Sequence, residues 1–171
     1  MQQVKFRPAT GSDTGVLCEI ANKAFGDEGE QIAALVEEMS SSDSCMLWLI
    51  ENTETRGFVG ASRALLGSDS FNNHWVLAPL GVRVDSQSAG LGGTLVLNCL
   101  EALNSTGAAG VFVYGDPGYY SRFGFQREST FTPIFELEYP EAWQAIWWTE
   151  KPSQKKTPLR VEGPLNNSDL W

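Results

Sequence analysis

Three glycines lie within four residues, at positions 90, 92 and 93, and they follow an apolar segment that ends near Val84. Glycine has no side chain that would keep a ligand away from the backbone. Residues 91–103 have apolar side chains at helical spacing, so the glycines are expected at the start of a helix. The first N–H groups of a helix have no partner within it and lie at the positive end of its dipole. The sequence therefore predicts a site for a phosphate or pyrophosphate at this turn.

Two other glycine-rich motifs fit this segment poorly. A Walker loop needs a lysine before its Ser or Thr, and no lysine precedes Thr94. A dinucleotide-binding fingerprint needs a third glycine where this chain has Leu95. The segment does contain Gln87-x-x-Gly90-x-Gly92. A glycine-rich strand-to-helix turn without a ligand stays open as an alternative.

A second string, G-D-P-G-Y-Y-S-R-F-G-F, occupies residues 115–125 and places Tyr120 four residues before Gly124. The two patterns together resemble the GCN5-related N-acetyltransferase (GNAT) family, whose acetyl-CoA signature is [Q/R]-x-x-G-x-[G/A] and whose second element is Y-x-x-x-G-F. The longer string is similar to that of a subgroup of predicted small N-acetyltransferases. The resemblance spans about residues 4–139 and is sharpest over 77–127.

The resemblance implies that acetyl-CoA is the acyl donor, as a co-substrate, and that no metal takes part. The strand before the turn is expected to pair with the pantetheine arm, and its backbone N–H at Val82 to polarise the thioester carbonyl. Ser88 departs from the family, in which glycine is frequent there, and Val84 stands where proline is frequent. The expected coenzyme-binding residues are Val82, Arg83, Val84, Gln87, Ser88, Ala89, Gly90, Leu91, Gly92, Gly93 and Thr94.

The resemblance also implies direct acyl transfer to a primary amine in a ternary complex. Tyr120 is expected near the coenzyme sulfur as a proton donor, because a phenol with a pKa near 10 is protonated at neutral pH. Asp116 is the best-placed candidate for the base, although a turn residue before Pro117 is the alternative. Glu28 and Glu30 either line the acceptor side or are solvated acids at a helix start.

Four other side chains are expected to have structural roles. We expect Tyr119 to be a packing or acceptor-side residue and Arg122 to pair with an acidic neighbour. His74, the only histidine, is expected at the surface, and Cys99 in the core. A catalytically idle acyl-CoA-binding or regulatory domain on the same scaffold stays open as an alternative function.

Composition limits the classes of partner. The chain has 171 residues, which suits one domain, and a formal net charge of −9, which disfavours binding to nucleic acid. The three cysteines match no metal-binding spacing and are expected as buried thiols in a reducing compartment, the cytoplasm. No apolar run is long enough to span a membrane. The expected acceptor is a small-molecule or peptide amine, and a homodimer is one open possibility.

The hydrophobic pattern predicts an α+β fold, and the resemblance implies a GNAT-like mixed, mostly antiparallel sheet of six to seven strands with about four helices. Residues 1–140 are expected to form this domain, and 141–171 a Trp-rich extension packed on it, whose secondary structure the pattern does not assign; Trp143 and Trp147 would share a face if that stretch is helical. Pro79 predicts a bulge or an edge in its strand. The expected strands are 4–7, 46–50, 58–66, 75–84, 110–114 and 131–139; the expected helices are 13–24, 28–39, 91–103 and one or two turns at 119–123; and 67–73 is expected to be a loop.

Overall fold

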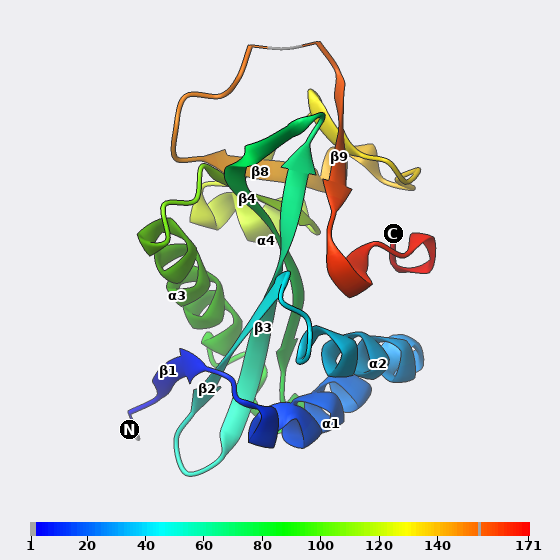
Figure 1. Cartoon of the computed structure of the whole chain (residues 1–171). Coiled ribbons are helices and arrows are strands. Elements are labelled where there is room, and N and C mark those ends of the chain that lie inside the picture. Colours follow the sequence, from blue (N-terminus) through cyan, green and yellow to red (C-terminus); the bar gives the residue numbers. More distant parts are fainter. Residues whose placement is uncertain (1–2, 154) are drawn as a thin grey trace.

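The structure is a computed structural model that describes residues 3–153 and 155–171, except for the side chains of residues 69–72. Four α-helices and nine strands follow one another along the described chain (Figure 1). In order they are β1 (Lys5–Pro8), α1 (Thr14–Ala24), α2 (Gly29–Met39), β2 (Cys45–Glu51), β3 (Thr55–Leu66), β4 (Asp69–Val82), α3 (Leu91–Ser105), β5 (Gly110–Tyr114), α4 (Pro117–Tyr120), β6 (Gln126–Arg127), β7 (Phe131–Pro133), β8 (Trp143–Trp147) and β9 (Thr157–Val161). None of the described helices is long and apolar enough to cross a membrane.

The strands form one mixed, mostly antiparallel sheet, as the sequence predicts. Its main path runs β1-β2-β3-β4-β5-β8-β6, while β9 pairs with β3 and the short β7 pairs with β9. The pairs along the main path are antiparallel except β4 with β5, which is parallel. That one parallel pair results from the crossover through α3, which returns the chain to the same end of the sheet.

The parallel pairing of β4 and β5 is short. It covers only the three residues His74–Val76, opposite Gly110–Phe112. Beyond that point β4 continues to Val82 along β3, whereas the rest of β5 is paired only with β8 on its other side. The two strands therefore separate toward their carboxyl ends.

Pro79 lies in the part of β4 that has left β5. A register shift between Val59 and Ala61 of β3 lies opposite this segment, and the Ala78–Pro79 peptide is cis. The predicted bulge at Pro79 is therefore confirmed.

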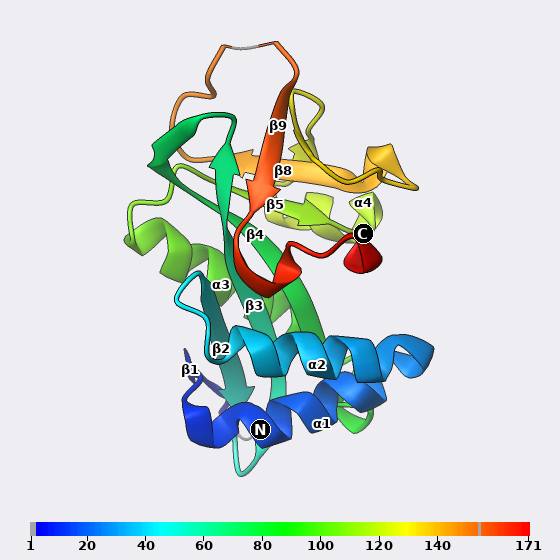
Figure 2. The same cartoon turned by 45° about the vertical axis from the view of Figure 1, so that its right-hand side comes forward.

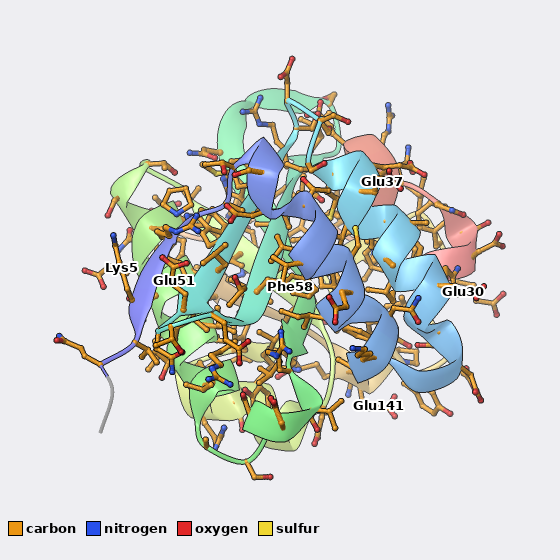
Figure 3. The ribbon with its side chains drawn as sticks, turned by 90° about the horizontal axis from the view of Figure 1, so that it is seen from below. Lys5, Glu30, Glu37, Glu51, Phe58 and Glu141 are labelled. Atoms are coloured by element: carbon orange, nitrogen blue, oxygen red, sulfur yellow. The ribbon has the colours of Figure 1, made fainter. Side chains whose placement is uncertain are left out.

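Helices cover both faces of the sheet. α1 and α2 pack together on one face, where Leu17, Ile20 and Val36 enclose Phe58 of β3. α3 packs on the other face through residues that include Leu95 (Figures 1 and 2). Seen from below, α1 and α2 lie side by side with Phe58 beneath them, and the charged side chains are on the outside (Figure 3). Each helix thus buries one apolar stripe, as its periodicity predicts.

Two predicted elements are wrong. Residues 67–73 are not a loop, because β3 and β4 form a hairpin that closes at the pair Leu66–Asp69, with Gly67 at a φ of +60°. Ladder hydrogen bonds join backbone groups, so a polar sequence can continue the strand. The strand expected at 131–139 ends at Pro133, and one further backbone hydrogen bond, from the Ile134 N–H to the Leu159 carbonyl at 3.2 Å, continues its contact with β9.

The Trp-rich segment is extended rather than helical. Trp143 and Trp147 belong to β8, which lies between β5 and β6 in the sheet. Positions four apart also share a face of a strand, so the spacing of the two tryptophans suited both structures. Trp143 is fully buried, and its indole N–H donates to the Phe131 carbonyl at 2.7 Å. This segment contributes to the core instead of covering it.

Two side chains for which the sequence predicts no catalytic role, those of His74 and Cys99, lie in the interior. His74 is only 1% exposed and contacts the rings of Phe112 and Trp147, so the prediction of a surface histidine is wrong. His74 lies on β4 at the start of its pairing with β5. Cys99 is buried on α3 as predicted, and burial raises the pKa of its thiol to about 12. Cys18 and Cys45 are partly exposed free thiols.

Glu128 is a buried carboxylate, 3% exposed, that joins β8 to the start of β7. It accepts hydrogen bonds from the backbone N–H groups of Thr130 at 2.8 Å and Phe131 at 3.0 Å, and from the Trp147 indole at 3.1 Å. The Lys151 ammonium lies 2.7 Å from the same carboxylate. Burial raises the pKa of Glu128, but the hydrogen bonds, led by that of Lys151, outweigh it, so the pKa is lowered overall.

This lowered pKa predicts an acid-sensitive contribution to stability. A carboxyl group whose pKa is lower in the folded state stabilises the fold above its ordinary pKa of 4.5, and the contribution is lost as pH falls through the folded value. We expect Glu128→Gln to lower the free energy of unfolding at pH 7 by about 1–3 kcal/mol. It should also flatten the fall in stability between about pH 5 and pH 3. Urea unfolding at several pH values measures both, and Glu101→Gln on the exposed side of α3 is the control; equal pH slopes for wild type and Glu128→Gln would contradict the assignment.

Candidate functional site

The turn between β4 and α3 leaves the first N–H groups of the helix without a protein partner. Gly90 is the N-cap, with φ +79°, and α3 begins at Leu91. The first bond within the helix runs from the Thr94 N–H to the Gly90 carbonyl at 3.1 Å. No side chain caps this end of α3. The N–H groups of residues 91–93 are therefore available to an anion, as the glycine pattern predicts.

Ser88 has a backbone conformation that explains why glycine would suit this position. Its φ is +65°, the only positive φ of a non-glycine residue among the described residues. A side chain in this region costs roughly 1–2 kcal/mol. The departure from the family pattern is therefore a local strain in the turn, and it leaves the amides of α3 in place.

A groove of about 720 Å³ begins at this helix end. Among the described residues that line it, Arg122 is the one that carries a charge. Eight of the eleven predicted coenzyme-binding residues line the groove: Val82, Gln87, Ser88, Gly90, Leu91, Gly92, Gly93 and Thr94. The other three do not: Arg83 and Val84 line a separate pocket beside α1, and Ala89 is exposed outside the groove.

The backbone of Val82 faces this groove. The Arg83 N–H donates to the Arg56 carbonyl at 2.8 Å, so the neighbouring pair, Val82 with Gly57, is a non-hydrogen-bonded pair of the ladder. The alternation of an antiparallel ladder then turns the Val82 N–H and C=O away from β3. Gln87 donates from its side-chain amide to the Val82 carbonyl at 3.2 Å. The glutamine of the motif therefore braces the turn against the end of β4.

Residues of α4 and of the turn that follows it form the far wall of the groove. A β-carbon on Gly92 would lie 2.7 Å from the Tyr119 hydroxyl, so a larger residue there would displace the end of the Tyr119 side chain. The Arg122 guanidinium lies over the Tyr119 ring, 4.7 Å from its centre. The described residues show no ion pair of Arg122, so the predicted acidic partner is not found. Tyr119 lines the groove itself instead of lying on the acceptor side.

Tyr120 lies next to the groove in an apolar environment. Its ring contacts that of Phe125 edge-on at 5.7 Å, and a β-carbon on Gly115 would clash with it. Burial, and to a smaller extent the neighbouring Tyr119, raises the pKa of the Tyr120 phenol. The phenol is therefore protonated throughout the neutral range and can donate a proton.

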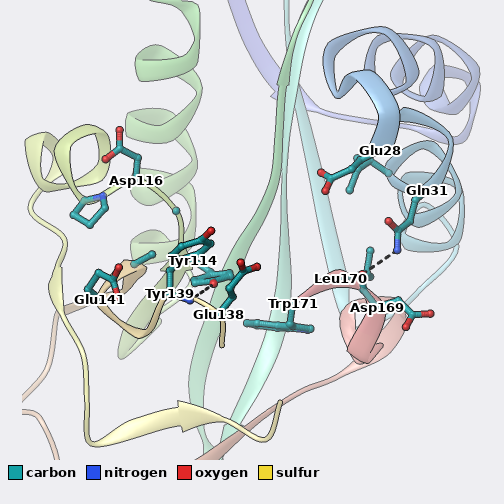
Figure 4. A pocket seen from close by; sticks show the side chains of 14 residues that line it. Glu28, Gln31, Tyr114, Asp116, Glu138, Tyr139, Glu141, Asp169, Leu170 and Trp171 are labelled. Carbon is teal, nitrogen blue, oxygen red and sulfur yellow. Dashed lines mark hydrogen bonds between the residues drawn. The ribbon is translucent and has the colours of Figure 1, made fainter. Parts of the chain in front are cut away.

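A second pocket, of about 550 Å³, lies at the carboxyl end of β5 (Figure 4). Asp116 is on its wall, and the Asp116 carboxylate accepts a hydrogen bond from the Gly118 N–H at 2.9 Å as the N-cap of α4. Asp116 therefore has the turn role that the sequence leaves open as the alternative, and it also lines the pocket. Glu28 also lines this pocket, whereas Glu30 is not among the lining residues.

The sequence did not reveal most of the lining of this second pocket. The missed residues include acids and aromatics from three separate segments: Tyr114, Glu138, Tyr139, Glu141, Asp169 and Trp171. Tyr114 stacks on Trp171 with ring centres 6.4 Å apart, and the Tyr114 hydroxyl accepts from the Tyr139 N–H at 3.0 Å. A cluster of acids at 136–141 was the only local signal.

Comparison with known proteins gives relatives in sequence and structure. No model of a protein family matches the chain. It is 29% identical over 165 residues to the uncharacterized N-acetyltransferase YjhQ of Escherichia coli, covering 92% of this chain and 88% of that protein. It is 33% identical over 111 residues to the uncharacterized N-acetyltransferase YhbS of E. coli, covering 63% of this chain and 64% of that protein.

Solved structures share the fold over nearly the whole chain. YhbS in complex with CoA has a TM-score of 0.83 at 20% identity, covering 95% of this chain and 91% of that one. A GNAT family acetyltransferase from Brucella melitensis in complex with acetyl-CoA has a TM-score of 0.75 at 22% identity, covering 92% and 96%. The described residues contain no cluster of side chains that could hold a metal ion. The chain therefore has the fold of the GNAT acetyltransferases, and the relatives that it matches in sequence are named N-acetyltransferases, which is consistent with an acyl-CoA-dependent transferase.

Proposed function

We propose that this protein transfers an acetyl group from acetyl-CoA to a primary amine by direct attack in a ternary complex. The observation that carries the proposal is the row of N–H groups at residues 91–93, which lines a groove whose wall includes Tyr119, the ring neighbour of Tyr120. Two structures of the same fold contain acetyl-CoA or CoA, which supports the choice of coenzyme. The separate pocket at Asp116 would receive the amine.

In this proposal the coenzyme is held mainly by backbone groups. The diphosphate would accept hydrogen bonds from the N–H groups of residues 91–93, which lie at the positive end of α3. The outward-facing backbone of Val82 would pair with the pantetheine amides, and its N–H would polarise the thioester carbonyl. Arg122 would add a positive charge to the phosphate side of the groove. Gln87 acts indirectly, by holding the end of β4.

Two side chains would move the protons. The amine attacks the thioester carbonyl, a C–N bond forms, and the C–S bond breaks. Tyr120 would donate its proton to the leaving thiolate, since burial keeps the phenol protonated. Asp116 is our candidate for the group that receives the proton of the amine, because its carboxylate lies on the pocket wall one residue from Gly115, which contacts Tyr120. Positioning the two reactants would supply much of the acceleration.

The first prediction tests the coenzyme site. We expect Gly92→Asp to raise the Kd for CoA at least about tenfold, because it places a negative charge and added bulk where the diphosphate would bind. The fold should be retained, since an acid near a helix N-terminus is favourable. Calorimetry gives the Kd and thermal unfolding gives the Tm.

A matched control comes from α1. Gly15, like Gly92, is the second residue of an α-helix, and a β-carbon there meets nothing within 4 Å. Gly15→Asp should leave the Kd for CoA unchanged. Equal affinities for wild type and a folded Gly92→Asp variant would refute the coenzyme site at α3.

A second prediction concerns the strained residue of the turn. Ser88→Gly should raise the free energy of unfolding by up to about 1 kcal/mol, because glycine adopts a positive φ without a steric cost. The amides of residues 91–93 are unaffected, so the Kd for CoA should change less than about threefold. Urea unfolding and calorimetry measure the two quantities. A loss of stability in Ser88→Gly would mean that the serine makes a compensating interaction.

A third prediction separates chemistry from binding. Tyr120→Phe should lower kcat about a hundredfold, since general acid catalysis contributes about that much or more, while the Kd for CoA changes less than about threefold. Thiol release from acetyl-CoA with a panel of amines gives kcat. Tyr119→Phe is the contrasting variant, because its hydroxyl lies beside Gly92 and its effect should fall on coenzyme affinity. Unchanged turnover in Tyr120→Phe would remove the acid role. Acetyl-CoA binding without turnover of any amine by the wild type would instead favour the idle acyl-CoA-binding domain.

A further inference from the structure

The pocket at the end of β5 is strongly acidic. Five carboxylates line it, and none of its described lining residues is basic. Glu28 directly precedes α2, and Asp116 follows β5. Glu138 and Glu141 precede β8, and Asp169 belongs to the C-terminal segment. Figure 4 shows that they surround the pocket from both sides, with Asp116 and Glu141 on one side and Glu28 and Asp169 on the other.

These carboxylates are not neutralised by the protein. The ion pairs among the described residues involve other acids, and none includes a carboxylate of this pocket. Like charges that converge on one cavity repel one another, and a cation placed between them is attracted by each. The pocket therefore favours a positively charged occupant and disfavours an acceptor with a carboxylate of its own.

The pocket also has aromatic walls that suit an alkyl chain with ammonium ends. Tyr114 and Trp171 are stacked at an angle of 22°, and the Tyr139 N–H donates to the Tyr114 hydroxyl. Ile32 and Leu170 add apolar surface. Aromatic faces attract ammonium groups, and methylene stems pack against apolar walls. In Figure 4 Trp171 lies between the two acidic sides of the pocket.

The places of the carboxylates around the pocket indicate how many amino groups the acceptor has. The reacting nitrogen must reach the side of Asp116 and Gly115, because Gly115 contacts Tyr120. Glu28 and Asp169 come from the opposite side of the pocket (Figure 4). The Glu28 carboxylate points into the space between the two sides, whereas the Asp169 carboxylate points away from it. A second positive charge on the acceptor would be attracted to Glu28.

We propose that the acceptor is a flexible small diamine or polyamine, in which one amine is acetylated beside Asp116 while a second ammonium is held by Glu138 and Glu28. The inference rests on the proposed acetyltransfer and deepens it by naming the class of substrate. A volume of about 550 Å³, bounded by the C-terminal segment, suits a small molecule better than a protein chain. Gln31 fixes that segment by donating to the Asp169 carbonyl at 3.1 Å.

The test compares three acceptors that share a four-carbon chain: 1,4-diaminobutane, butylamine and 4-aminobutanoate. Thiol release from acetyl-CoA gives kcat/KM for each. After correction for its two equivalent amines, the diamine should exceed butylamine at least about tenfold, and 4-aminobutanoate should be the poorest acceptor. The advantage of the diamine should shrink as salt is raised from 0.05 to about 0.5 M, because exposed charges are screened.

Single substitutions test where the second ammonium of the diamine binds. Glu138→Gln and Glu28→Gln should each raise the KM for 1,4-diaminobutane about fivefold or more, with kcat within about twofold, and should leave butylamine kinetics unchanged. The matched control is Glu37→Gln on the outer side of α2, which lies away from the pocket (Figure 3). It should change neither acceptor.

The outcomes distinguish failure of this inference from failure of the proposed function. Turnover with equal efficiency for diamine and monoamine, or a preference for a lysine-containing peptide, would overturn the diamine site and leave the acetyltransferase standing. Calorimetry of 1,4-diaminobutane with the CoA-loaded protein provides a readout without turnover. Saturable binding that is weakened by Glu28→Gln supports the site, and no heat at millimolar diamine overturns it. Absence of CoA binding would instead remove the proposed function.

Discussion

The separation of β4 from β5 is the constraint on which the rest of the structure depends. Three parallel residue pairs hold the strands together, and beyond Val76 each strand keeps only its outer neighbour. A backbone N–H that has lost its strand partner needs another one, and Val82 meets that condition at the edge of the groove. The same separation places α3 and α4 around one opening and the end of β5 beside the other. A fully paired sheet would leave room for neither.

Close approach of backbone segments then sets the geometry of the groove. Gly92 lets the Tyr119 hydroxyl come near α3, and Gly115 leaves space for the Tyr120 ring. The aromatic rings that follow keep Tyr120 in apolar surroundings, which is why its pKa is raised. The two sequence motifs are thus parts of one packing arrangement: each supplies a glycine that accommodates a tyrosine.

The sequence predicted the turn and the helix start before α3 well because their determinants are local. Eight consecutive positions from Gln87 to Thr94 contain a turn, a cap and a helix start, and their chemistry depends little on distant residues. The acidic pocket could not be predicted in this way, because Glu28, Glu138 and Asp169 meet only through the fold. The burial of His74 was missed for the same reason, since the residues that cover it belong to β5 and β8.

The C-terminal part of the chain both supports the sheet and lines the second pocket. β8 pairs along all of β5, so it supports the strand whose end carries Asp116, and Glu128 anchors β8 to β7 through a buried carboxylate. The same region contributes Glu138 and Trp171 to the pocket wall. Substitutions there can change the charge and shape of the second pocket while the turn before α3 stays as it is. In the proposed function, a short local segment would therefore recognise the coenzyme, and residues brought together by the whole fold would recognise the acceptor.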